Sequence, residues 1–269
     1  PDGRRIAFVS WRDGNQDIYI FSLDTQEITN LTNTPNRAED HPAWSPDGRH
    51  IAYTAIEAGI ETIFIKSADN PGAEARIFRR GRTPAWSPDG SKLAVTLSFE
   101  NNPDIYVIDL ATGNRTRLTT HWGIDTEPSW SPDGNRIVFT SDRGGNPHIY
   151  EIPATGGDPR RLTFEGRQNL RATYSPDGEK LLIVHLAGSG YQIALMDLRS
   201  RDVQPLTRGP LDESPTFAPN GQMVIYATRG SRGAELATVT VDGRVRQSLR
   251  QSGEVREPAW SPHFRAQRN

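Results

Sequence analysis

The sequence predicts an all-β fold, a six-bladed β-propeller with four antiparallel strands in each blade. The tetrapeptide Ser-Pro-Asp-Gly, or a close variant of it, recurs along the 269 residues, and its prolines stand 42 to 45 residues apart. A repeat of this length is typical of one four-stranded propeller blade. Short runs rich in β-branched and aromatic residues flank each turn, and no helical periodicity extends far. The repeat prolines are Pro1, Pro46, Pro88, Pro132, Pro176, Pro219 and Pro262.

Each repeat gives four strands in order, as one blade shows. Proline presets φ at the second position of a tight turn, and glycine takes the left-handed position that ends it. The turn Ser131–Gly134 therefore joins the strand Pro128–Trp130 to the strand Arg136–Thr140 as a hairpin. Further along, Ile149–Ile152 and Arg161–Thr163 supply the third and fourth strands.

A bulky aromatic residue stands two positions before six of the repeat prolines. These side chains would either form a ring on which a ligand stacks or pack between neighbouring blades. We expect packing, and removal of one buried aromatic should then cost about 3–5 kcal/mol. The residues are Trp44, Trp86, Trp130, Tyr174, Phe217 and Trp260.

The two ends of the sequence predict how the ring closes. The chain starts inside a repeat turn, as though cut there, and it ends with Pro258–Pro262, the strand that precedes such a turn. One C-terminal strand should therefore complete a blade with three N-terminal strands, which leaves only short edges exposed. We expect residues 1–262 to form a single domain. Residues 263–269 fall outside the repeat and are expected to be a disordered tail.

Composition and motifs exclude several classes of function. The formal net charge of -2 gives no electrostatic reason to bind nucleic acid. No stretch approaches the roughly 20 apolar residues of a membrane-spanning helix, and no charged and apolar leader opens the chain. The absence of cysteine excludes disulfides and thiolate chemistry. Hydrolase elbows, zinc motifs and phosphate-binding loops are missing, so the sequence offers no catalytic residues.

The loops that lead into the innermost strands should form the mouth of the central channel. Four of the six mouth segments carry two carboxylates each. These carboxylates would either attract a cation or a basic or polar peptide, or accept hydrogen bonds and hold the loops. Both roles remain open for any single carboxylate. For the six mouth segments together we favour binding. The segments are Glu39–His41, Gly81–Thr83, Asp125–Glu127, Gln168–Arg171, Asp212–Ser214 and Glu254–Glu257.

Three further mouth residues are predicted to contact a partner. Asp40 and His41 lie in the first mouth segment, and Trp122 lies in a loop of the same face. Exposed tryptophan is a residue type that anchors protein interfaces, and the alternative role of Trp122 is to cover the end of a blade.

From about Arg82 to Pro262 the sequence resembles the C-terminal propeller of the TolB family, which belongs to the Tol–Pal system of the bacterial cell envelope. Many propellers share the Ser-Pro-Asp-Gly turn, whereas the runs Leu211–Thr228 and Val255–Pro262 are specific to this family. The motifs that carry the resemblance are Ile124–Gly134, Leu162–Gly166 with Gln168 and Asn169, Leu211–Pro215, Ala218–Thr228 and Val255–Pro262.

The resemblance implies a periplasmic, non-enzymatic and monomeric scaffold that needs no cofactor. Its partner would be a Pal-type lipoprotein domain or a colicin-type translocation peptide, bound at the channel mouth. Carried over by motif, the binding residues would be Thr83, Thr126, Glu127, Gln168, Asn169, Asp212, Glu213, Arg256 and Glu257. The resemblance also implies a helper Ca²⁺ at the mouth, held by Asp125, Glu127, Asp212 and Glu257. The family's N-terminal α/β domain is missing from this sequence, so we expect no contact with TolA.

Two alternatives remain open from the sequence. The first two blades, with the run Trp11–Tyr19, look less like TolB, which favours a hybrid or engineered propeller without a retained natural function. The second alternative is an enzyme that acts on an envelope polysaccharide through channel carboxylates and either His41 or His121. Its mark would be a pocket with a histidine beside paired carboxylates and a shifted pKa.

Overall fold

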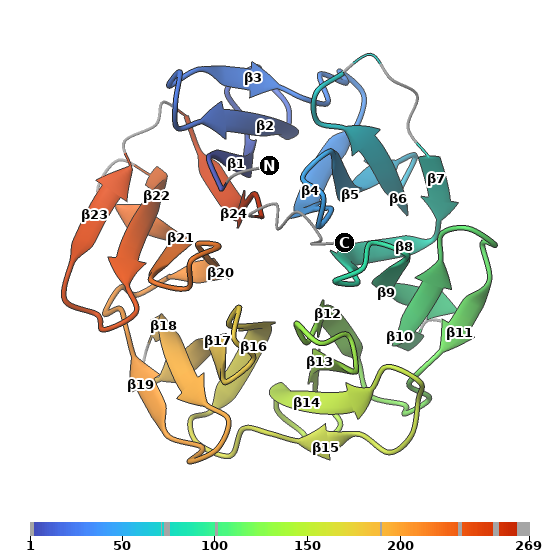
Figure 1. Ribbon diagram of the computed structural model, residues 1–269, viewed down its shortest axis with the longest axis vertical. Helices are drawn as coiled ribbons and strands as arrows, with labels where there is room; N and C mark the ends of the chain where they lie inside the picture. The colour runs from blue at the N-terminus through green and yellow to red at the C-terminus, as the bar shows by residue number, and fades with distance from the viewer. Residues whose placement is uncertain are drawn as a thin grey trace, which may run out of the picture.

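The chain folds into six four-stranded antiparallel sheets that stand around a central channel (Figure 1). The computed structural model describes residues 3–70, 72, 76–99, 102–188, 190–230, 233–249 and 253–262. The predicted six-bladed all-β propeller is confirmed. The predicted tail, residues 263–269, lies outside the described residues.

Each blade contributes one strand to each of four concentric layers. The innermost strands are β24 (Val255–Trp260), β4 (Ala38–Trp44), β8 (Gly81–Trp86), β12 (Asp125–Trp130), β16 (Gln168–Tyr174) and β20 (Glu213–Phe217). The second strands are β1 (Arg5–Ser10), β5 (His50–Glu57), β9 (Lys92–Phe99), β13 (Arg136–Ser141), β17 (Lys180–Ala187) and β21 (Met223–Gly230).

The two outer layers complete the blades. The third strands are β2 (Asp17–Ser22), β6 (Ile60–Ser67), β10 (Asn102–Asp109), β14 (His148–Pro153), β18 (Gly190–Asp197) and β22 (Gly233–Thr240). The outermost strands are β3 (Ile28–Asn30), β7 (Arg76–Arg79), β11 (Arg115–Arg117), β15 (Arg160–Arg161), β19 (Val203–Pro205) and β23 (Arg246–Leu249). The described part of the chain contains no helix long and apolar enough to cross a membrane.

The ring closes as the sequence predicts. The C-terminal strand β24 pairs with β1 in the sheet order β24-β1-β2-β3, and Trp260 stands opposite Ile6 (Figure 1). The Gly3 amide donates to the carbonyl of Pro262 at 3.2 Å, and the Trp260 indole donates to the carbonyl of Gly3 at 2.6 Å. We number this shared sheet blade 1, so that β20–β23 form blade 6.

The repeat turn joins the first two strands of each blade through its own side chains. In Ser131–Gly134, the Gly134 amide donates to the carbonyl of Ser131 at 2.9 Å, and Gly134 has the left-handed φ of 72° that favours glycine. The Ser131 hydroxyl and the Asn135 amide both donate to Asp133 and lower the pKa of that carboxyl to about 2. The aspartate is therefore an ionised cap for the turn.

The hydrophobic core lies between neighbouring blades. In one cluster Ile18 and Leu31 of blade 1 pack with Tyr53 and Phe64 of blade 2. The predicted packing role of the repeated aromatics is confirmed, because Trp44 belongs to this same cluster. Its indole also donates across the blade boundary to the carbonyl of Ala259 at 3.0 Å. The sheets thus form one ring with two faces. The mouth face carries the loops between second and third strands and between blades, and the hairpin face carries the repeat turns.

Candidate functional site

Six side chains at one repeat position form a polar ring in the channel. Every innermost strand has a β-bulge near its middle, where the register with the second strand shifts. Each bulge contains a non-glycine residue with φ between 50° and 56°, five positions before the repeat proline. Such backbone is uncommon outside glycine, and bulges re-aim side chains next to functional sites. The polar ring consists of His41, Thr83, Glu127, Arg171, Ser214 and Glu257.

The sequence explains why each bulge forms there. In five of the six strands a proline follows the polar-ring residue, as Pro42 follows His41, and Ala172 follows Arg171 in the remaining strand. Proline has no N–H to offer to the ladder, so it fits a place where regular pairing is interrupted. The bulges give the polar ring a fixed geometry that does not depend on flexible loops.

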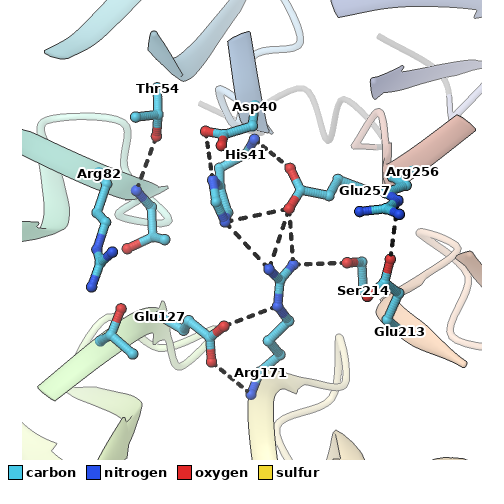
Figure 2. Close-up of polar contacts among 12 residues, drawn as sticks. Asp40, His41, Thr54, Arg82, Glu127, Arg171, Glu213, Ser214, Arg256 and Glu257 are labelled. Atoms are coloured by element: carbon cyan, nitrogen blue, oxygen red, sulfur yellow. Dashed lines mark hydrogen bonds and ion pairs between the residues drawn. The ribbon is translucent and has the colours of Figure 1, made fainter. Parts of the chain in front are cut away.

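Arg171 reaches across the channel and contacts four other members of the polar ring, among them His41, whose Nε2 is 3.4 Å from the guanidinium (Figure 2). Its guanidinium lies 2.9 Å from a carboxylate oxygen of Glu127 and 3.2 Å from one of Glu257. It also donates to the hydroxyl of Ser214 at 2.7 Å. The charge of Arg171 is therefore shared by carboxylates from two blades. Burial alone would lower the pKa of Arg171, but the charges of Glu127 and Glu257 outweigh burial and raise it above the ordinary arginine value.

His41 lies between two carboxylates on the far side of this network (Figure 2). Its Nδ1 is 2.7 Å from Asp40, its Nε2 is 3.3 Å from Glu257, and its backbone amide donates to Glu257 at 2.6 Å. Burial alone would lower the pKa of His41, but the charges of Glu257 and Asp40 outweigh burial and raise it. For Glu257, His41 and Arg171 outweigh burial and lower the pKa of its carboxyl.

The polar ring separates the mouth from a cavity inside the channel. This cavity, of about 370 Å³, is lined by the innermost strands from the polar ring toward the repeat prolines. Its walls are mostly proline, alanine and the repeated tryptophans, for example Pro42, Ala43 and Trp86. The mouth is thus polar and charged, while the space behind it is largely apolar.

Three of the predicted mouth carboxylates lie inside the blades. Asp125 is fully buried and binds Arg143 at 2.7 Å. Asp212 is also buried and accepts hydrogen bonds from the Gly209 amide at 3.0 Å and the Thr228 hydroxyl at 2.6 Å. Burial raises the pKa of Glu39 to about 7. These three carboxylates are turned into the blades, where they hold loops. The mouth is therefore less acidic than the sequence of its segments suggests.

The predicted calcium ligands do not come together. Among the residues that the structure describes, no three histidine, aspartate or glutamate side chains are placed to hold one metal ion. Asp125 and Asp212 point into separate blades, and Arg171 already neutralises Glu127 and Glu257. The four predicted ligands therefore do not face one another in this structure, and the guanidinium of Arg171 lies against two of them, Glu127 and Glu257.

Asn169 and Gln168, both predicted to bind a partner, contact neighbouring side chains. Asn169 is buried and bonds to the imidazoles of His148 at 3.1 Å and His185 at 2.8 Å. Burial lowers the pKa of both histidines, so they stay neutral near pH 7. Gln168 accepts a hydrogen bond from the Tyr191 hydroxyl at 2.7 Å.

The other predicted residues line the mouth itself. Thr83 bonds to Thr96 at 2.8 Å, and Thr96 bonds to Thr126 at 3.3 Å, which links two blades through hydroxyl groups. Glu213 and Arg256 lie 3.7 Å apart with their side chains half-exposed (Figure 2). Both charges therefore remain accessible to a partner.

Exposed apolar residues gather on the mouth face. Among the described residues nine large apolar side chains are exposed, and seven of them belong to loops or strand ends of this face. Trp122 is 79% exposed and Phe164 is 70% exposed, which is rare for aromatic side chains. Leu23 and Val245 lie at turns of the hairpin face. The seven are Ile56, Ile60, Phe99, Trp122, Ile124, Phe164 and Leu211.

The predicted binding residues omit two members of the polar ring, Arg171 and Ser214. The mouth segments include both, but the motif resemblance does not single them out. The signal that finds them is positional, because all six polar-ring residues stand three places before the repeated aromatic. The residues three places before the repeated aromatics therefore identify the polar ring from the sequence alone.

The sequence is similar to those of known TolB proteins. The TolB beta propeller domain family (PD40) matches residues 41–264. The Tol-Pal system protein TolB of Methylococcus capsulatus (strain Bath) is 67% identical over 73 residues, which cover 27% of this chain and 16% of that protein. The TolB of Ruthia magnifica is 47% identical over 237 residues, covering 83% of this chain and 54% of the relative.

A solved structure gives the same relation in three dimensions. The crystal structure of TolB from Acinetobacter baumannii superposes with a TM-score of 0.87 and 40% sequence identity, over 96% of this chain and 66% of that one. The chain spans about half the length of the Ruthia relative.

The family match also bears on the hybrid hypothesis. It starts at residue 41 in blade 2 and continues past Thr83, so the likeness is not restricted to the last four blades. The chain belongs to the TolB beta propeller domain family.

Proposed function

We propose that this propeller is a non-enzymatic scaffold that binds a polypeptide partner at its mouth face. The observation that carries the proposal is that seven of the nine exposed large apolar side chains among the described residues lie on the mouth face. Exposed apolar patches rimmed by polar groups are typical of protein-binding surfaces. The charged pair Glu213 and Arg256 stays half-exposed at the same mouth and would orient the partner.

The partner we propose is a Pal-type periplasmic lipoprotein domain, with a colicin-type translocation peptide as a competitor for the same surface. Support comes from the relatives, which are named as Tol-Pal system proteins. A periplasmic location follows from the same relation and is part of the proposal.

Calorimetric titration with a purified Pal-type periplasmic domain tests this function. Trp122→Ala should weaken binding by about tenfold or more, because an exposed aromatic anchor contributes at least about 1.4 kcal/mol. The matched control is Val245→Ala, an exposed apolar residue of the hairpin face, which should leave the affinity unchanged. Equal affinities for the wild type and a Trp122→Ala, Phe164→Ala double variant would argue against the mouth face.

A second candidate, an enzyme acting on an envelope polysaccharide, is favoured by one observation. His41 stands beside Asp40 and Glu257 with a raised pKa, as a general acid–base site would require. Arg171 binds the same Glu257, however, so this carboxylate already has a cation partner. We therefore rank this candidate second. Release of new reducing or unsaturated ends from an acidic polysaccharide, abolished in His41→Gln, would reverse the ranking.

A further inference from the structure

A small second cavity lies on the mouth face between blades 5 and 6. Its volume is about 120 Å³, and apolar side chains line it beside charged ones. Leu170 and Tyr191 also pack against the hydrophobic core cluster beneath it. The apolar lining residues are Leu170, Val184, Tyr191 and Leu211, and the polar ones are Glu127, Arg171, Asp212 and Glu213.

The walls of this cavity are preformed. The linker that carries Leu211 forms a bridge with Tyr191, in which the Tyr191 amide donates to the Pro210 carbonyl at 3.1 Å. The Asp212 amide donates back to the carbonyl of Tyr191 at 3.0 Å. Gly190 allows this contact, since a Cβ there would lie only 3.0 Å from the Pro210 Cα. Binding to such a fixed pocket loses little conformational entropy.

Only one carboxylate of this cavity remains available to a ligand. Glu127 is neutralised by Arg171, and the carboxylate of Asp212 accepts two internal hydrogen bonds. Glu213 is 47% exposed, and the guanidinium of Arg256 is 3.7 Å away from it. The pocket is thus apolar inside, with one accessible negative charge at its rim.

We propose that this anchor pocket receives one apolar side chain of leucine to phenylalanine size from an extended partner segment. A lysine or arginine next to that side chain faces Glu213. The size follows from the volume, because an apolar cavity of about 150 Å³ holds a benzene-sized group. The inference rests on the proposed function, since it assigns the chemistry of a polypeptide bound at the mouth face. The pocket shares Glu127 and Arg171 with the channel cavity, so it adjoins the polar ring.

Methyl NMR of the full chain with three capped dipeptide amides tests this proposal. Acetyl-Leu-Lys-amide should cause saturable shifts of the methyl groups of Leu170, Val184 and Leu211. Acetyl-Ala-Lys-amide should bind at least about tenfold more weakly, because it buries fewer methyl groups. Acetyl-Leu-Glu-amide should bind at least about threefold more weakly, because it places a carboxylate beside Glu213.

Two variants and one control complete the test. Leu211→Ala removes part of the pocket wall and should lower the affinity for acetyl-Leu-Lys-amide by about fivefold or more. Leu211 is half-exposed, so this variant should still fold. Glu213→Gln should abolish the preference for Lys over Glu and keep the preference for Leu over Ala. Leu23→Ala, at an exposed site on the hairpin face, should change nothing.

The outcomes separate this inference from the proposed function. Shifts that do not saturate, or equal binding of the Leu and Ala peptides, overturn the anchor pocket. If the Pal-type domain binds normally and Leu211→Ala leaves its affinity unchanged, the pocket fails while the function stands. If the dipeptides bind as expected and the Pal-type domain does not bind, the pocket stands and the proposed partner is wrong.

Discussion

At the scale of single residues, Arg171 is the centre of the mouth. It binds carboxylates from blades 4 and 1 and a hydroxyl from blade 6, so one side chain links strands that are far apart in sequence. A partly buried pair of this kind is costly to break because the remaining carboxylates stay uncompensated.

Removal of this guanidinium should destabilise the fold. Arg171→Gln leaves Glu127 without a cation and Glu257 with His41 alone, and we expect a loss of about 3 kcal/mol in urea unfolding at low ionic strength. The matched control is Arg160→Gln, which removes an exposed arginine 2.8 Å from Glu151 and should cost less than about 1 kcal/mol. Equal losses in the two variants would contradict a central role for Arg171.

Glu39 should make stability depend on pH. Burial raises the pKa of its carboxyl from 4.5 to about 7. An acid that binds its proton more tightly in the folded state stabilises the fold below its unfolded pKa, and this contribution is lost as the pH rises through the folded pKa. Glu39→Gln stays neutral. Its free energy of unfolding, relative to that of the wild type, should therefore rise by about 2–3 kcal/mol between about pH 5 and pH 8.

Urea unfolding at several pH values measures this difference. Glu27→Gln, which alters an exposed carboxyl, serves as the control and should run parallel to the wild type. If Glu39→Gln also runs parallel to the wild type, Glu39 is ionised in the folded state and our account of its burial is wrong.

At the scale of elements, the repeat motif specifies both the hairpins and the blade contacts. The repeated aromatics were predictable as blade-packing residues because they recur at one position of every repeat. The bulges were not predicted, although a proline follows five of the six left-handed residues, because those residues include a β-branched one, Thr83, which rarely adopts this conformation. Strain of this kind is imposed by the closed sheet and not by local preference.

Trp44 should therefore matter for stability and Trp122 for binding. Trp44→Ala removes a buried side chain and its bond to the neighbouring blade, and should cost about 3–5 kcal/mol in thermal or urea unfolding. Trp122→Ala changes a side chain that is 79% exposed and should leave the unfolding free energy within about 0.5 kcal/mol. The reverse order of effects would contradict the assigned roles.

The candidate site was less predictable than these elements. The mouth segments were correctly placed at the inner strands, yet Asp125, Asp212 and Asn169 turn into the blades and bind neighbouring groups there. Sequence position places a residue at a loop end, whereas the direction of its side chain depends on partners such as Arg143 in another strand. The ion pairs of Arg171 with Glu127 and Glu257 were not predicted for the same reason, because they depend on the directions of side chains from different strands.

At the scale of the whole molecule, stability depends on closure through β24. Its register with β1 places Trp260 opposite Ile6, and Val255 packs with Phe8 and Tyr19 in the core cluster between blades 6 and 1. The contact between β24 and β1 was predictable from the repeat. The C-terminal end of the chain contributes one strand of a blade, and the N-terminal end contributes the other three. Loss of β24 would expose the edge of β1 and open the ring.

A circular permutant tests this closure. Moving residues 253–262 in front of Asp2 recreates a Ser-Pro-Asp-Gly turn between β24 and β1, like Ser131–Gly134. We expect the permutant to unfold in one transition, with a midpoint at or above that of the wild type, since the two strands become covalently adjacent. Deletion of the same residues is the contrasting variant and should abolish the cooperative transition. A folded deletion variant would contradict closure by β24.

Hydrogen–deuterium exchange of the complex with a Pal-type periplasmic domain tests the central claim, that the partner binds the mouth face, most directly. We predict protection of the mouth-face loops around Trp122, Phe164 and Leu211, with unchanged exchange in the hairpin-face turns around Asp133 and Val245. Protection centred on the hairpin-face turns, with the mouth-face loops unchanged, would contradict the account.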